Sequence, residues 1–296
     1  MQTWVMFTLL AAFMQAIRTA GQKEIARHIS PMTTTLVRYL FGLPFAVGYL
    51  LLVSSGRSRP LIQEAAGNMP FLVYASLAAV VQILASVALV KVLSRRNFVV
   101  GTSFAKTEAI QTALISTVFF GSFLSMFDWL AVILGVFGVV VMSFRGAGQR
   151  IDKSSFLYGI GAGTGFAITS LWLRQASLSL GYSLIENAAI TLCYMVSMQT
   201  LICLLYTACV ERGQLAGVTK QLPLAIFIGA TSAFGSVGWF TAMSYENAAL
   251  VKSLGQIEFV FTLSITSWFF KEKIVARETV GVAAIIFSIL ILLLLA

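Results

Sequence analysis

Six ionisable side chains of this 296-residue chain lie inside long apolar stretches. They are Arg18, Arg38, Lys106, Glu108, Lys252 and Glu258. A charge near the centre of a bilayer costs at least ~2.5–3.5 kcal/mol on insertion scales, so such residues usually face a partner or a wet cavity. The set therefore predicts a polar interior that binds a small polar or charged molecule. Arg18 could instead extend toward the end of its own helix.

The stretches that carry these residues are long enough to cross a membrane. The chain is 58% hydrophobic and 10% charged, whereas a soluble domain has roughly 25% charged residues. A bilayer core about 30 Å thick needs ~20 mostly apolar residues per helix. Ten such stretches fit the sequence, at approximately 2–22, 33–53, 70–93, 98–121, 126–144, 156–178, 185–208, 222–244, 248–270 and 276–296. We therefore expect an all-α integral membrane protein with ten transmembrane helices.

One part of the chain is repeated. Residues 90–123 and 240–273 align without a gap at an offset of 150. The basic residues of the connections change sides between the two copies, so the copies run in opposite directions through the bilayer. Inverted repeats build two access states around one central site in many secondary transporters. The sequence predicts two inverted five-helix repeats, 1–148 and 149–296, which together form one transmembrane domain.

The repeat relates the ionisable residues of the fourth and ninth stretches. Glu108 aligns with Glu258, and each is followed at every fourth residue by a hydroxyl side chain on the same helix face. By this pseudo-symmetry Lys106 could pair with Glu258, and Lys252 with Glu108, simply to hold helices together. Alternatively, the two glutamates serve proton coupling or gating. The sequence leaves both interpretations open.

Polar and aromatic residues of other stretches could complete a substrate pocket with the four basic residues. The further candidates for substrate binding are Gln15, Gln82, Trp172, Tyr194, Trp239 and Gln256. An aromatic wall with a few convergent polar groups suits a small amphipathic metabolite. Aromatic residues in membrane helices also serve packing or interface anchoring, which is the alternative for each of them.

The lysines and arginines near the ends of the stretches indicate the orientation. Most lie on one side, and the side that includes both termini carries only Arg57, Arg59 and Arg174. By the positive-inside rule both termini face away from the cytoplasm, across the cell inner membrane. The net charge of +9 is spread over the helix ends. We therefore expect no nucleic-acid partner.

No signature of catalysis, metal binding or a cofactor accompanies these helices. The cysteines, Cys193, Cys203 and Cys209, fall in one stretch without metal-ligand spacing, and His28 is the only histidine. No phosphate-binding loop ending in Gly-Lys-Ser/Thr occurs, so the chain carries no ATPase of its own. We expect no metal, no cofactor and no enzyme activity.

Several residues stand in an order that resembles a known family. They are Ser30-Pro31, Arg38, Glu108, Glu258 and Phe270-Lys271-Glu272. In order, spacing and duplication the chain resembles the EamA-type transporters of the drug/metabolite transporter superfamily, over essentially its whole length. The resemblance implies ten helices around a central cavity. It also implies transport of amino acids, amines, drugs, sugars or nucleotide-linked metabolites, by proton coupling or exchange.

We therefore expect a secondary transporter that exports or exchanges a small polar metabolite by alternating access. The basic interior residues favour an amino acid or a related carboxylate. A proton-coupled exporter of drugs or other cations is the alternative, with the glutamates as counter-ions. An alternative of another class is a non-transporting membrane receptor or scaffold. The expected partners are the substrate, protons as a candidate coupling ion and the lipid bilayer, and the chain acts as a monomer or homodimer.

Overall fold

A computed structural model describes residues 2–94, 104–143, 153–270 and 276–295. Every regular element in these ranges is a helix. The elements are α1 (Thr3–Ile25), α2 (Pro31–Leu40), α3 (Leu43–Val53), α4 (Ser58–Gly67), α5 (Met69–Leu93), α7 (Glu108–Phe120), α8 (Met126–Ser143), α9 (Lys153–Leu178), α10 (Leu184–Cys209), α11 (Gln214–Lys220), α12 (Leu222–Tyr245), α13 (Ala248–Leu254), η1 (Gly255–Ile257), α14 (Glu258–Phe270) and α15 (Ala276–Leu294). The motif residues Lys271 and Glu272 lie outside the described ranges.

Eight helical segments within the described ranges are long and apolar enough to cross a membrane. They are Thr3–Ile25, Pro31–Val53, Met69–Leu93, Lys153–Leu178, Leu184–Cys209, Leu222–Tyr245, Ala248–Ile265 and Ala276–Leu294. Two further apolar helices, Glu108–Phe120 and Met126–Met142, are shorter. The prediction of an all-helical membrane protein is confirmed for these residues. The short helices α4 and α11, which lie in connections between the spans, were not predicted.

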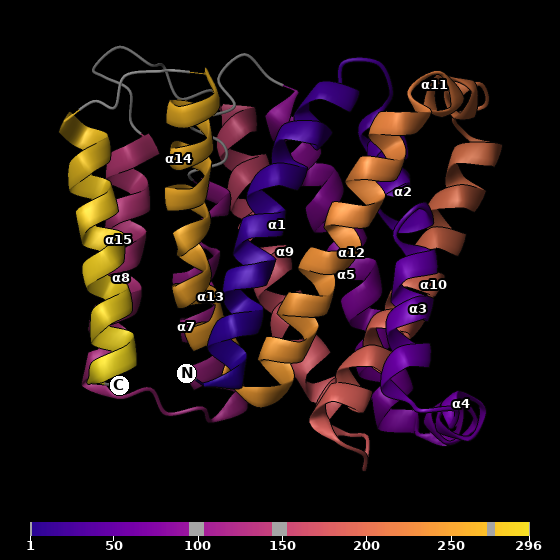
Figure 1. Cartoon of the computed structure of the whole chain (residues 1–296), viewed down its shortest axis with the longest axis horizontal. Coiled ribbons are helices and arrows are strands. Elements are labelled where there is room, and N and C mark those ends of the chain that lie inside the picture. The colour runs from indigo at the N-terminus through magenta and orange to yellow at the C-terminus, as the bar shows by residue number, and fades with distance from the viewer. Residues whose placement is uncertain (1, 95–103, 144–152, 271–275, 296) are drawn as a thin grey trace.

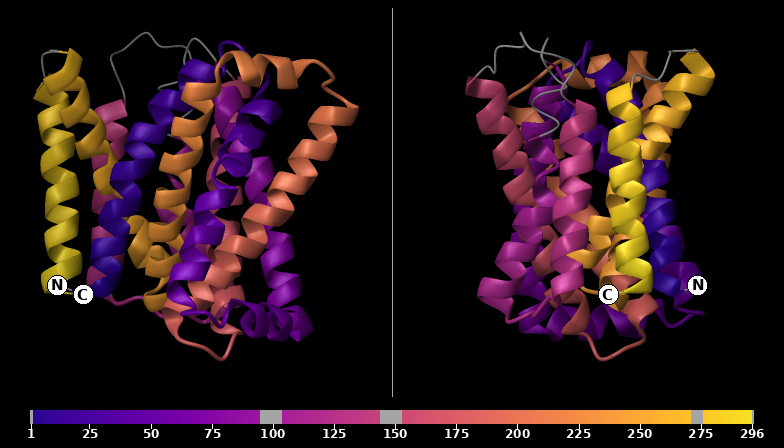
Figure 2. Two further views of the ribbon diagram at one scale, coloured as in Figure 1. Left: turned by 45° about the vertical axis from the view of Figure 1, so that its right-hand side comes forward. Right: turned by 90° about the vertical axis from the view of Figure 1, so that its left-hand side faces the viewer.

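The long helices run side by side with roughly parallel axes, and the short helices α4 and α11 lie across them (Figure 1). Both chain ends lie at the same end of the bundle in every view (Figures 1 and 2). Helix α4 lies at that end too, and α11 lies at the opposite end. The chain therefore crosses the bundle an even number of times.

The main helix contacts join the two halves of the sequence. The most extensive packing joins α1 to α12, α5 to α9 and α8 to α15. In addition, α10 packs against α2 and α3, and α7 packs against α13. Each of these contacts joins one helix from residues 1–148 to one helix from residues 149–296. The halves are thus interleaved, and a space at the centre is lined by both.

The second span is broken in its middle. Helix α2 ends at Leu40 and α3 begins at Leu43. Pro44 has no N–H and cannot donate to the carbonyl of Leu40, so a continuous helix would lose a hydrogen bond there. The break leaves Arg38 in the last turn of α2, in the middle of the span.

The backbone is irregular beside the charged residues of α7, α13 and α14. The 3-10 turn η1 separates α13 from α14, so Lys252 lies in the last turn of one helix and Glu258 begins the next. In the other half α7 begins at Glu108, directly after a turn that contains Lys106. The N-terminal end of a helix carries partial positive charge, which favours a carboxylate in its first turn. Irregular backbone at membrane depth is tolerated where it lines a cavity.

A glycine brings α1 and α12 close together. A Cβ atom at Gly238 would lie 2.5 Å from the carbonyl oxygen of Phe7 and 2.8 Å from the Cβ of Ala11. A larger side chain does not fit at this contact without separating the helices. The close approach places Gln15 of α1 opposite Trp239 of α12, and the indole N–H of Trp239 donates to the amide oxygen of Gln15 (3.0 Å).

Gly238→Ala is expected to lower the free energy of unfolding by about 1–3 kcal/mol, because the added methyl group meets backbone atoms of α1. A denaturant titration of the purified protein in detergent measures this. Gly161→Ala is the matched control, since a Cβ there meets no atom within 4 Å and alanine favours the helix. Equal unfolding free energies for the two variants would contradict the tight contact.

Candidate functional site

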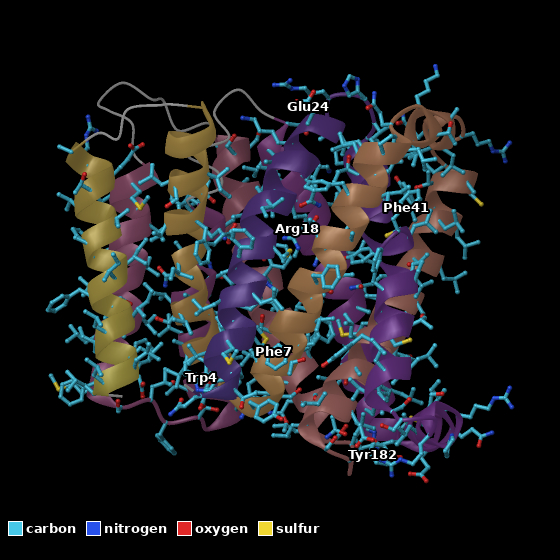
Figure 3. All side chains as sticks on the ribbon, in the orientation of Figure 1. Trp4, Phe7, Arg18, Glu24, Phe41 and Tyr182 are labelled. Atoms are coloured by element: carbon cyan, nitrogen blue, oxygen red, sulfur yellow. The ribbon has the colours of Figure 1, made fainter. Side chains whose placement is uncertain are left out.

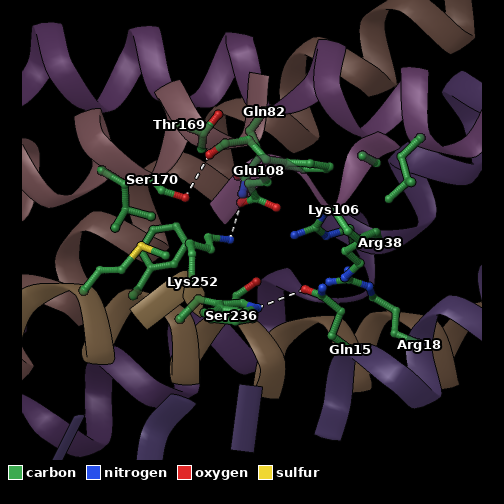
Figure 4. A pocket seen from close by; sticks show the side chains of 17 residues that line it. Gln15, Arg18, Arg38, Gln82, Lys106, Glu108, Thr169, Ser170, Ser236 and Lys252 are labelled. Carbon is green, nitrogen blue, oxygen red and sulfur yellow. Dashed lines mark hydrogen bonds and ion pairs between the residues drawn. The ribbon is translucent and has the colours of Figure 1, made fainter. Parts of the chain in front are cut away.

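A cavity lies at the centre of the bundle and is lined by both halves (Figure 4). Most of the residues that the sequence proposed for a substrate pocket line it. These are Gln15, Arg18, Arg38, Gln82, Lys106, Glu108, Trp239 and Lys252. The cavity therefore collects side chains from α1, α2, α5, α7, α12 and α13, and from the turn before α7.

Two ion pairs connect the halves at this cavity. The Nζ atom of Lys252 lies 2.6 Å from Oε1 of Glu108, and the Nζ atom of Lys106 contacts Oε2 of Glu258. At most 21% of the surface of any of these side chains is exposed. Each pair joins a lysine of one half to a glutamate of the other. These are the two pairings that the sequence analysis considered as one of its interpretations.

A short hydrogen-bonded chain extends one of these pairs. The amide nitrogen of Gln15 donates to Oε2 of Glu258 (2.6 Å), and its amide oxygen accepts from Trp239. The ammonium group of Lys252 lies over the Trp239 ring, 4.3 Å from its centroid, where a cation is attracted by the ring face. Gly255 lies against the same ring, and a Cβ atom there would clash with it. Trp239 is thus fixed by contacts from α1, α13 and η1.

Two arginines add positive charge that is not in an ion pair with any described carboxylate. Arg18 is 4% exposed and Arg38 is 7% exposed. Arg38 donates to the hydroxyl of Ser86 (3.1 Å). The Nε atoms of both arginines have no hydrogen-bond partner, and no carboxylate of the described residues lies within ion-pair distance of either guanidinium. Since an uncompensated buried charge is costly, this arrangement needs water or an anion in the cavity.

Arg18 does not extend toward the end of α1. Figure 3 shows it between Glu24, near one end of the bundle, and Trp4, near the other. In Figure 4 its side chain lies beside that of Arg38 on one side of the cavity. The alternative in which Arg18 reaches the membrane surface is therefore wrong for this conformation, because packing of α1 against α12 directs that helix face inward.

A smaller pocket adjoins the cavity and shares Lys106, Glu108 and Lys252 with it. Gln256 of η1 lines this pocket together with Glu258. The Gln256 side chain is 4% exposed, and neither of its amide atoms has a hydrogen-bond partner. Across the described residues, no group of three or more His, Cys, Asp or Glu side chains is placed to hold a metal ion.

One known protein family matches part of the chain. Residues 2–144 match the sequence profile of the EamA-like transporter family. Over these residues the chain is similar to the EamA-like transporters. Together with the apolar helices, this match supports a multi-pass membrane protein. The match covers the helices that carry Arg18, Arg38 and Glu108.

A solved structure extends the likeness to the whole chain of this EamA-like protein. It is described only as "Crystal structure of protein" and superposes with a TM-score of 0.74 at 12% sequence identity. The alignment covers 99% of this chain and 96% of the other. At that identity the likeness shows the fold alone. No curated protein sequence matches the chain.

Two residues proposed for the pocket lie elsewhere in this EamA-like chain. The hydroxyl of Tyr194 shares a hydrogen bond with that of Ser76 (2.8 Å), and its ring meets the edge of Phe71. Trp172 packs against the hydrophobic core and does not line the cavity. Both are held by neighbouring helices, which the sequence alone does not reveal.

The cavity wall contains residues that the sequence analysis missed. On α9 they are Phe166, Thr169, Ser170 and Leu173. Their spacing of three, four and seven residues defines one helix face, and Trp172 lies roughly 110° away from that face at 100° per residue. The same spacing from Ser236 through Trp239 to Met243 lines the wall on α12. Helical periodicity could have found these faces once one residue of each had been placed.

Lys252→Met is expected to lower the free energy of unfolding by about 3–5 kcal/mol, because it leaves the buried Glu108 without its counter-charge. A variant that combines Lys252→Met with Glu108→Met should recover most of this loss, since no unpaired charge remains. Denaturant titrations of the wild type, both single variants and the double variant give the coupling energy. A coupling energy near zero would mean that the pair does not stabilise the fold.

Proposed function

We propose that this chain is a secondary transporter that exports or exchanges a small carboxylate-bearing metabolite by alternating access. Amino acids and related carboxylates are the first class to test. The single observation that supports this is the pair of buried arginines, Arg18 and Arg38, which line a central cavity and form no ion pair with a described carboxylate. An anion that enters the cavity would supply the missing negative charge.

The proposed architecture is two inverted five-helix repeats, 1–148 and 149–296, with ten spans when the two shorter apolar helices are counted. A two-fold axis in the membrane plane would exchange the contact between α1 and α12 with that between α9 and α5. It would also exchange Glu108 with Glu258, whereas Lys106 aligns with Gln256 and Lys252 with Thr102. The helix contacts support the proposal.

The proposed orientation follows from the basic residues. Both termini lie at one end of the bundle, and the side of the termini carries few lysines and arginines. We assign this end to the non-cytoplasmic face of the cell inner membrane by the positive-inside rule.

Polar contacts at both ends of α10 are candidates for the groups that break when the cavity opens to either side. At one end Arg57, beside α4, donates to Oε1 of Glu186 (2.8 Å). At the other end Glu211, between α10 and α11, accepts from the hydroxyl of Thr33 (2.9 Å) and from that of Ser30. These contacts join the two ends of α10 to α2 and to the start of α4, so relative motion of the halves would disturb at least one of them.

A cation as the cargo is disfavoured. Glu108 and Glu258, which would have to bind it, are already paired with lysines. The remaining basic groups at the cavity would repel a positive charge. The glutamates instead suit a coupling or gating role, because protonation of either would release its lysine.

Exchange in proteoliposomes tests the transport function. Vesicles loaded with a mixture of amino and organic acids should take up a labelled acid by counterflow. Arg18→Gln and Arg38→Gln should each lower the rate at least tenfold, because each removes a buried positive charge that would contact the anion. A tenfold change corresponds to about 1.4 kcal/mol. Arg59→Gln, at an exposed position of α4, is the matched control and should leave the rate unchanged. Indifference to amino and organic acids alike would reject the function.

Neutralising the glutamates tests proton coupling. Glu108→Gln or Glu258→Gln should remove the dependence of uptake on a pH gradient, because the amide no longer binds and releases a proton. Counterflow exchange, which needs no net proton movement, should persist at a measurable rate. If both variants retained gradient-driven uptake, the coupling role would be excluded and the pairs would serve structure alone.

A further inference from the structure

We infer that the cavity takes a substrate that carries two negative charges and no ammonium group, bound at Arg18 and Arg38. The inference rests on the transport function proposed above and names the class of cargo. It excludes simple zwitterionic amino acids as the preferred substrates.

The charges at the cavity set the charge of the cargo. With Glu258, which Lys106 contacts, the described cavity wall carries four basic and two acidic side chains. Each lysine is paired with a glutamate, so these four groups cancel. Arg18 and Arg38 leave a net charge of +2 in a buried space. A dianion neutralises this charge, a monoanion leaves half of it, and a zwitterion leaves all of it.

The same pairs leave no place for an ammonium group. The carboxylate of Glu108 faces Lys252, and that of Glu258 accepts from both Lys106 and Gln15. A substrate ammonium would find no unpaired carboxylate on the described cavity wall and would lie among four cations. Since charge repulsion is weakly screened inside a protein, this is a strong discrimination against zwitterions.

The arginine side chains are free to bind the anion. Arg18 makes no hydrogen bond to the described protein residues, and Arg38 uses only one nitrogen, for Ser86. A guanidinium presents its N–H donors in a planar fork that matches a carboxylate or a phosphate. The two forks lie beside each other at one side of the cavity (Figure 4). Both can therefore reach negative charges carried by one small molecule.

The remaining wall suits the uncharged part of the cargo. Phe166, Leu173, Phe240 and Met243 supply apolar surface to the cavity. The hydroxyl of Ser170 donates to the carbonyl of Phe166 in its own helix, so its oxygen remains available to accept from a substrate hydroxyl. A short carbon skeleton with or without a hydroxyl group fits this surface.

Two kinds of molecule share the required chemistry, a dicarboxylate and a phosphomonoester. Thermal unfolding of the detergent-purified full chain at pH 8 distinguishes them, since a ligand that binds the folded state raises its stability. The probes are succinate, monomethyl succinate, 4-aminobutyrate and glycerol 3-phosphate, whose phosphate is doubly charged at this pH. Sodium chloride holds the ionic strength constant.

The expected result is a rise in melting temperature with succinate or glycerol 3-phosphate. The half-saturating concentration of that dianion should be at least tenfold lower than that of monomethyl succinate, and 4-aminobutyrate should have no effect. A response to succinate identifies the dicarboxylate, and a response to glycerol 3-phosphate identifies the phosphomonoester. Arg18→Gln and Arg38→Gln should each weaken the response at least tenfold, whereas Arg59→Gln should preserve it. If an arginine variant fails to fold, the wild-type series still decides the question.

Equal responses to succinate and its monomethyl ester, a response to 4-aminobutyrate, or no response to either dianion would overturn the inference. The proteoliposome assay separates this failure from that of the proposed function. If the protein exchanged zwitterionic amino acids and did not respond to dianions, the transport function would be supported and the dianion inference would be rejected. The absence of exchange for every acid would remove the transport function itself.

Discussion

The two lysine–glutamate pairs at the centre of the bundle are the contacts on which the arrangement depends. Taking four charges out of water is costly, and only close pairing offsets that cost. Lys106 and Glu258 come from different halves, as do Lys252 and Glu108. Neither half can therefore bury its own charges, and the interior is complete only when the halves interleave. The pairs hold the two halves together at the central cavity, and they also give the cavity a polar wall.

Breaks in the helices place the charged side chains at the cavity. Helices α7 and α14 both begin at the paired glutamates, where the helix dipole stabilises a carboxylate. The break between α2 and α3 leaves Arg38 beside the same cavity. In a continuous helix, charged residues at successive positions would face different neighbouring helices. Short irregular segments instead bring charges from several spans to one space, where water or a ligand can satisfy the exposed backbone.

The sequence predicted those parts of the site that charge and symmetry control. Charged residues in apolar stretches usually face a partner or a wet cavity, and the two lysine–glutamate pairings considered from the sequence are the ones observed. The positions of Trp172 and Tyr194 could not be predicted, because an aromatic ring gains similar energy from a cavity wall and from a packed core. The lining residues of α9 were missed because none of them is charged.

An experimental structure determined in the presence of selenate is the most direct test of the excess positive charge in the central cavity. Selenate is a dianion whose anomalous scattering identifies its position. The account predicts a selenium peak between Arg18 and Arg38, with the ion pair of Lys252 and Glu108 intact beside it. Guanidinium groups that pair with protein carboxylates, or lysines that point toward acyl chains around an empty apolar centre, would contradict it.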